Sequence, residues 1–90
     1  MQIRFLTVDS QEVFLLGYPL RLSKTEHKLL DIIARGGRCG VDDLAELLPQ
    51  GVSKGNVAVH INAINKKARA ISGRKLIIYE DQSYKINPFM

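Results

Sequence analysis

The sequence predicts a small α+β domain in which short antiparallel strands come first, three helices follow, and a β-hairpin closes the chain. Three observations support this order: β-prone runs interrupted by turn residues over 1–22, segments with helical start and stop signals over 23–73, and two further β-prone runs around a polar turn over 74–90. No internal repeat or linker-like stretch divides the sequence, so we expect one domain over residues 1–90.

The first 22 residues are expected to form an antiparallel meander. Asp9 and Ser10 are turn formers, and the Gly-Tyr-Pro sequence of residues 17–19 interrupts the apolar pattern a second time. The β-prone runs that these residues separate are 3–6, 13–16 and 20–22.

Helix signals follow directly. Ser23 and Glu26 have the spacing of a capping box, in which the side chain of each residue bonds the backbone N–H of the other. The helix that they begin is expected to stop at the two glycines of 36–37. A shorter helix fits residues 42–48, directly before Pro49, which cannot continue it.

The third helix carries the most information about function. It is expected to begin after Ser53, run to about Ser72 and end at Gly73. Its apolar side chains recur every three or four residues, and therefore on one side of a helix, at Val57, Ile61, Ile64, Ala68 and Ile71. At about 100° per residue the opposite side presents Gly55, Val59, Asn62, Lys66 and Arg69, with Ala58 at its edge. One side is thus predicted to pack into the core, and the other to face solvent or a partner.

Two β-prone runs, 76–79 and 84–86, flank the polar residues 80–83 and predict a hairpin. Lys85 is the one basic side chain of these runs, and two acidic residues lie near the expected tip. The hairpin thus offers one possible contact to a polyanion and a tip that a polyanion would repel.

Charge is unevenly distributed along the chain. The net charge is +4, but residues 1–48 carry six Lys/Arg against seven Asp/Glu, a net of −1, and residues 49–90 carry seven against two, a net of +5. A basic half is typical of proteins with a polyanionic partner. Cys39 is the single cysteine and cannot form an internal disulfide, and no apolar run approaches the roughly 18 residues that span a bilayer. We therefore expect a cytoplasmic protein without membrane contact.

Catalysis is not expected. His27, His60 and Cys39 show no metal-ligand spacing, and the acidic cluster over 42–46 suits the first turn of a helix, where the helix dipole favours negative charge. The sequence has no glycine-rich phosphate loop and no Ser/His/Asp constellation. We expect no enzyme activity, no cofactor and no metal site.

The outer side of the third helix has the chemistry to bind DNA. An α-helix about 10–12 Å across fits the major groove, which is about 12 Å wide. Asn62 can form two hydrogen bonds to adenine, and Val59 can contact a thymine methyl group. Lys66 and Arg69 lie farther along the same side and suit phosphates. The alternative at this point is an amphipathic helix whose polar side is only solvated.

The chain resembles the OmpR/PhoB-type winged-helix effector domain of response regulators over nearly its whole length. The segments that carry the resemblance are 6–9, 17–26 and 29–30 at the opening strands and first helix, 57–61 and 64–67 in the recognition helix, and 76–77 and 84–86 in the wing. The resemblance implies a winged helix-turn-helix fold with a four-stranded N-terminal sheet, a third helix that reads the major groove and a wing that tracks the minor groove. It further implies a contact between loop 49–55 and RNA polymerase, a preceding receiver domain and tandem dimers on DNA.

The expected function is sequence-specific binding of double-stranded DNA in transcription regulation, as the effector domain of a two-component-type response regulator. The residues expected to contact DNA are Ala58, Val59 and Asn62 at the bases, and Lys54, Lys66, Arg69 and Lys85 at the backbone. Lys67 points more to the flank and ranks lower. Four phosphate contacts predict a salt slope of about −3.6, from about −0.9 per contact, so a lone domain would bind weakly at physiological salt.

Several positions depart from the family pattern. Ala58 stands where the family has Asp, and Asn62, Ala63 and Asn65 stand where it often has arginines. Residues 81–84 lack the wing's arginine and both of its glycines. These departures affect the expected DNA contacts more than the fold, because the apolar stripe of the third helix is intact. His27 also replaces the family's Phe, and we expect a partly buried imidazole there.

Two other functions remain open on sequence grounds. A winged-helix protein-interaction module that has lost DNA recognition would show no salt-dependent DNA binding and would expose an apolar patch for its partner. A small hydrolase or metal-dependent enzyme would need polar residues clustered in a pocket.

Overall fold

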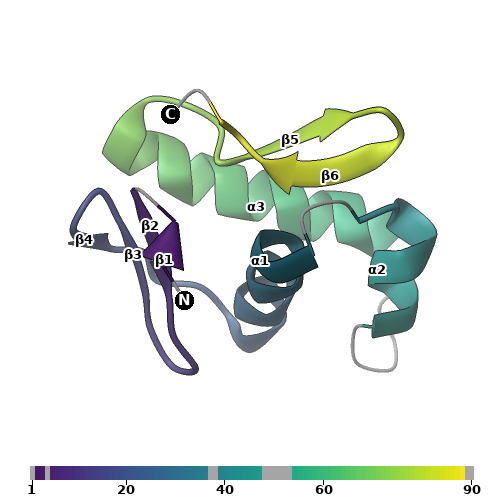
Figure 1. Ribbon diagram of the computed structural model, residues 1–90, viewed down its shortest axis with the longest axis horizontal. Coiled ribbons are helices and arrows are strands. Elements are labelled where there is room, and N and C mark those ends of the chain that lie inside the picture. Colours follow the sequence, from purple (N-terminus) through teal and green to yellow (C-terminus); the bar gives the residue numbers. More distant parts are fainter. Residues whose placement is uncertain (1, 4, 37–38, 48–53, 89–90) are drawn as a thin grey trace.

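The computed structural model describes residues 2–3, 5–36, 39–47 and 54–88 (Figure 1). The elements are β1 (Gln2–Ile3), β2 (Leu6–Val8), β3 (Val13–Leu15), β4 (Tyr18–Pro19), α1 (Lys24–Gly36), α2 (Val41–Leu47), α3 (Lys54–Ser72), β5 (Ile77–Glu80) and β6 (Ser83–Ile86). The first four strands form one antiparallel sheet in sequence order, and the last two form a hairpin. The α+β class and the predicted order of strands, helices and hairpin are therefore confirmed.

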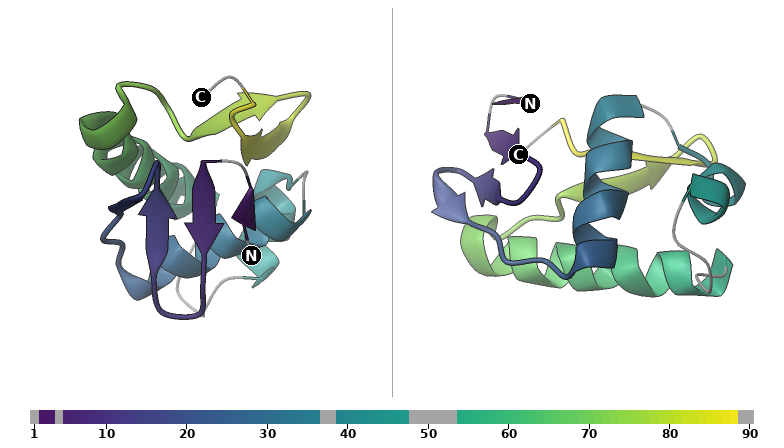
Figure 2. Two further views of the ribbon diagram at one scale, coloured as in Figure 1. Left: turned by 60° about the vertical axis from the view of Figure 1, so that its left-hand side comes forward. Right: turned by 90° about the horizontal axis from the view of Figure 1, so that it is seen from below.

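Helix α3 is the longest element, and the others are arranged around it. The sheet lies near its C-terminal end and α2 near its N-terminal end, while the hairpin runs alongside it (Figure 1). Helix α1 meets α3 at a steep angle in the right-hand view of Figure 2. One side of α3 is thus covered by the rest of the domain, which leaves the opposite side exposed.

The sheet differs from the sequence prediction at two places. A single strand over 3–6 is wrong: Ile3 pairs with Leu6, so the chain reverses between them and β2 is a separate strand. Leu6 and Val8 are both fully buried. They are two residues apart and so point to the same face of β2, and the burial of this face fixes the position of the strand. The expected third strand over 20–22 is wrong as well, because the strand at this place, β4, covers only Tyr18–Pro19.

The early start of β4 follows from the turn that precedes it. Leu16 and Gly17 both have positive φ, 54° and 82°, as the two-residue turns of hairpins require. The strands can therefore pair again directly after Gly17, and Tyr18 lies opposite Leu15.

The helix boundaries agree with the local signals in the sequence. The capping box is present, since the Ser23 N–H donates to Glu26 Oε1 at 2.8 Å and the Glu26 N–H donates to Ser23 Oγ at 3.2 Å. Helix α3 ends at Gly73, whose φ of 75° suits glycine and whose N–H donates to the Arg69 carbonyl at 2.9 Å. Helix α2 begins one residue before its expected start. The expected cap at Ser53 and stop at Pro49 lie outside the described residues.

The core is formed by buried apolar side chains from the sheet, all three helices and the hairpin. The predicted stripe of α3 contributes directly, since Val57, Ile61, Ile64 and Ala68 are buried and Ile71 is partly buried. Burial of one such Val, Leu or Ile side chain stabilises the fold by roughly 1.5–3 kcal/mol. The orientation of α3 is therefore determined by its apolar side.

The closing hairpin has a shorter turn than the sequence suggested. Residues 80–83 were expected to form the connection, but Glu80 pairs with Ser83 and the turn contains two residues. Asp81 and Gln82 adopt positive φ values of 53° and 62°, so the turn follows the two-residue geometry without a glycine. Cys39 exchanges two backbone hydrogen bonds with Tyr84, which joins the hairpin to the segment before α2.

Candidate nucleic-acid interface

The outer side of α3 brings most of the predicted contact residues together. Val59 is 62% exposed. The other members of this surface are also exposed, and they are Ala58, Asn62, Lys66 and Arg69. Lys54 is the first residue of α3, but its side chain lies outside the described part of the structure. We call Ala58, Val59, Asn62, Lys66 and Arg69 the outer face of α3.

Lys67 lies next to this face but has a different partner. Its Nζ donates to Glu26 Oε1 at 2.6 Å, and Glu26 is only 5% exposed. Burial alone raises the pKa of Glu26, but the hydrogen bonds from Lys67 and Ser23, together with the Lys67 charge, outweigh it and lower the pKa overall. Lys67 thus ties α3 to the start of α1.

Asn65 has a structural role that the sequence analysis did not identify. It is 7% exposed, and its Nδ2 donates to the Ile77 carbonyl at 3.0 Å while its Oδ1 accepts the Ile77 N–H at 2.8 Å. A single side chain therefore satisfies both backbone groups of the first residue of β5. The available signal was its spacing: Asn65 lies four residues after Ile61 and three before Ala68, on the buried side of the helix.

The hairpin presents less positive charge than Lys85 alone suggests. Lys85 Nζ lies 3.2 Å from Glu80 Oε1, so its charge is already paired. Glu80 and Asp81 are exposed at the hairpin tip. The adjacent Tyr79 and Tyr84 rings meet edge to face with centroids 4.9 Å apart.

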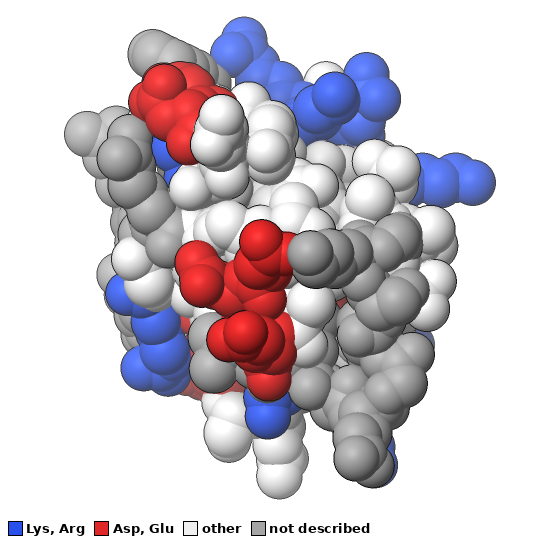
Figure 3. Space-filling model, turned by 90° about the vertical axis from the view of Figure 1, so that its right-hand side faces the viewer, with Lys and Arg blue, Asp and Glu red and all other residues white. Residues whose placement is uncertain are grey.

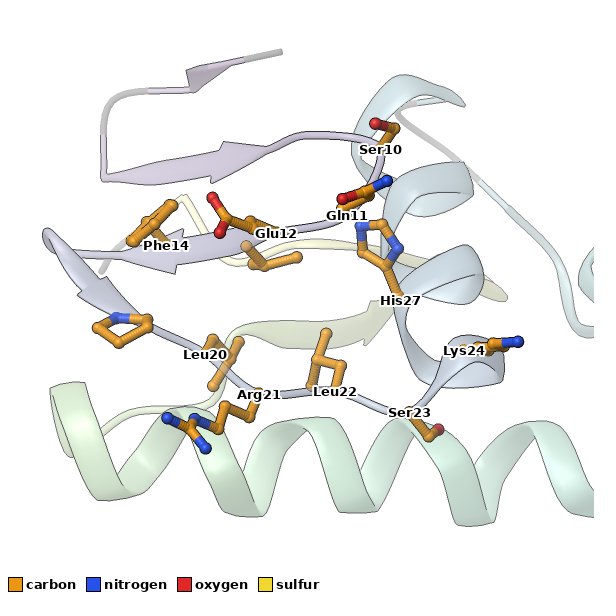
Figure 4. Close-up of a pocket in the computed structure, with 12 residues that line it drawn as sticks. Ser10, Gln11, Glu12, Phe14, Leu20, Arg21, Leu22, Ser23, Lys24 and His27 are labelled. Carbon is orange, nitrogen blue, oxygen red and sulfur yellow. The ribbon is translucent and has the colours of Figure 1, made fainter.

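A cavity of about 530 Å³ lies on another side of the domain, between β3, the segment before α1 and α1 itself (Figure 4). His27 is partly buried at its edge, as predicted, and its Nε2 lies 2.7 Å from the Asp9 carbonyl oxygen. A backbone carbonyl only accepts hydrogen bonds, so Nε2 carries the proton. In the described ranges, no three or more His, Cys, Asp or Glu residues come together as a possible metal site.

Comparison with known proteins identifies the architecture. No protein-family model and no curated protein matches the chain. Among solved structures, the chain is similar to the DNA-binding domain of the response regulator AdeR, which was crystallised in complex with an intercistronic region. The similarity covers 96% of each chain with a TM-score of 0.79, at 16% sequence identity. The fold is a winged helix-turn-helix.

In this winged-helix domain, α2 and α3 form the helix-turn-helix and the β5–β6 hairpin is the wing. The four-stranded N-terminal sheet that the resemblance implied is present. The Asn65 hydrogen bonds connect α3 to the first strand of the wing, so the two elements are held in one relative position. None of the described helices is both long and apolar enough to cross a bilayer.

Proposed function

We propose that this winged-helix domain binds double-stranded DNA through the outer face of α3 and regulates transcription, as the effector domain of a two-component-type response regulator. The observation that carries the proposal is the orientation of α3, whose apolar stripe is buried while Asn62, Lys66 and Arg69 are exposed on the other side. The similarity to a DNA-binding domain solved on an intercistronic region supports it. A helix presented in this way fits the major groove.

The proposed contacts follow from chemistry and position along α3. Asn62 would bond an adenine edge, and Val59, with Ala58 beside it, would contact thymine methyl groups. Lys54, Lys66 and Arg69 would neutralise phosphates. Lys85 would contribute less than these, because Glu80 already pairs with it.

Further partners are proposed on the resemblance alone. Loop 49–55 would contact RNA polymerase, but residues 48–53 lie outside the described structure. A tandem dimer on DNA would compensate for the small number of phosphate contacts that one domain makes, because linked sites raise the apparent affinity.

Fluorescence anisotropy with labelled duplexes at several salt concentrations tests the proposal. Replacing both Lys66 and Arg69 with Ala is expected to weaken binding to all sequences and to reduce the magnitude of the salt slope by about 1.8, from about 0.9 per phosphate contact. The matched control replaces Lys28 and Arg35, two exposed basic residues of α1, and removes the same charge. Equal effects of the two double variants, or no salt-dependent binding by the wild-type domain, would contradict the proposal.

Asn62 provides a separate test of base recognition. Asn62→Ala is expected to relax the preference for adenine at one position of DNA selected by the wild-type domain, at a cost of about 1–3 kcal/mol in discrimination. The salt slope should stay unchanged, because Asn62 carries no charge. A variant that loses affinity equally for all sequences would argue against a base contact.

A further inference from the structure

The wing of this domain is poorly suited to follow a phosphate backbone. Within its described residues, 77–86, the one cation is Lys85, and Glu80 pairs with it at 3.2 Å. Glu80 and Asp81 expose their carboxylates at the tip. Duplex DNA carries about one negative charge per 1.7 Å of its axis, so an acidic tip is repelled when it approaches the backbone.

Helix α2 adds to this negative charge. Asp42, Asp43 and Glu46 are exposed, and Gly40 lies close to both Asp43 and the wing-tip residue Gln82. Figure 3 shows acidic side chains over the middle of the face that carries α2 and the wing tip, with basic ones mainly toward its edges. Backbone binding therefore has to come from elsewhere in the domain.

Exposed basic side chains occur at the other end of α3. Arg69 is in its last turn, Lys66 lies about one turn earlier, and Lys75 follows the helix end at Gly73. Arg21 comes from the segment before α1, far away in sequence. In Figure 4 its guanidinium extends from this segment toward the side of the domain that α3 forms.

The backbone around Arg21 holds this side chain outward. Leu20 is buried, and its N–H donates to the Val13 carbonyl at 2.8 Å, while Leu22 packs against the core. Ser23 then caps α1. In an extended segment alternate side chains point to opposite faces, so two inward leucines direct Arg21 to solvent. An arginine on an anchored backbone loses less conformational freedom when it binds phosphate than one on a mobile loop.

We propose that Arg21 is a further contact to the DNA backbone, and that Arg21, Lys66, Arg69 and Lys75 form a phosphate-binding edge at the C-terminal end of α3 while the wing tip stays off the duplex. This inference rests on the proposed DNA binding through α3. The segment before α1 would thus contact the DNA backbone, which the acidic wing is poorly suited to do.

Two arginine variants measured on the same mixed-sequence duplex test the role of Arg21. Arg21→Ala is expected to reduce the magnitude of the salt slope by about 0.9 and to weaken binding to all sequences. Arg35→Ala removes the same charge from the C-terminal end of α1, where Asp31 pairs with Arg35 at 2.7 Å, and should leave the slope unchanged. Both residues are exposed, so amide spectra of the two variants should show an intact fold.

The outcomes separate this inference from the proposed function. If the wild-type domain shows a salt-dependent affinity, and Arg21→Ala has the same affinity and the same salt slope, DNA binding stands and the Arg21 contact is refuted. If the wild-type domain does not bind DNA, both proposals fail. Lys85→Ala tests the wing: it should reduce the slope less than Arg21→Ala does, and the reverse order would show that the wing follows the backbone.

Discussion

Replacing Asn65 with Ala is expected to lower the free energy of unfolding by about 2–6 kcal/mol. The Asn65 side chain satisfies both the N–H and the carbonyl of Ile77, at 2.8 and 3.0 Å, in a buried environment. Loss of the side chain leaves two buried backbone groups without these partners, and each costs about 1–3 kcal/mol. Urea unfolding monitored by circular dichroism measures the change.

Asn62→Ala is the matched control, because it makes the same substitution one turn earlier on the exposed side of α3. It should change the free energy of unfolding by no more than about 0.5 kcal/mol. Asn65→Ala should also accelerate hydrogen exchange of the Ile77 amide, which loses its acceptor. Equal stabilities of the two variants would show that the link between α3 and the wing is unimportant for the fold.

Replacing Glu26 with Gln is expected to lower the free energy of unfolding by about 1–3 kcal/mol at neutral pH. The buried Glu26 carboxylate accepts hydrogen bonds from the Ser23 N–H and from Lys67 Nζ, which join the start of α1 to α3. Hydrogen bonds to a charged group contribute about 1.5–3 kcal/mol, and the neutral amide retains only part of this. Chemical denaturation of Glu26→Gln, Lys67→Met and the double variant gives the coupling between the two residues, and additive effects would argue against the pair.

The same carboxylate makes stability depend on pH. The folded-state pKa of Glu26 lies below its ordinary value of 4.5, so the folded protein holds this proton less readily than the unfolded chain. Its contribution to stability is therefore complete above pH 4.5 and is lost as the pH falls through the lowered folded-state pKa. Glu26→Gln should flatten this acid limb of the stability curve, whereas Glu46→Gln, an exposed control on α2, should leave it in place.

Local patterns explain why the helices could be predicted well. The capping box at Ser23 and Glu26, the stripe of α3 and the stop at Gly73 each depend on residues within a few positions of one another. The outer face of α3 followed from the same stripe, because a helix that buries one side must expose the other. The expected base contacts were for this reason located on the exposed surface, although their binding stays a prediction.

The sequence predictions were wrong or incomplete where strand pairing, or contacts between distant residues, determine the structure. Leu16, Asp81 and Gln82 adopt positive φ without being glycine, so the two hairpin turns carry no clear local signal, and strand boundaries moved by several residues. The Asn65 bonds to Ile77 join residues that are 12 positions apart. The proposed grouping of Arg21 with α3 joins segments that are far apart in the sequence. Periodicity places Asn65 on the buried side of α3, but neither periodicity nor composition identifies its partner.

Cys39 offers a native reporter of wing detachment. Its side chain is 6% exposed, and its backbone bonds to Tyr84 hold the wing over it. Burial, and then the charge of Asp43, raise the pKa of the thiol, so the reactive thiolate is scarce while the wing is closed. Alkylation of this sulfur therefore requires a local opening of the domain, and its rate would measure how often the wing lifts from the helices.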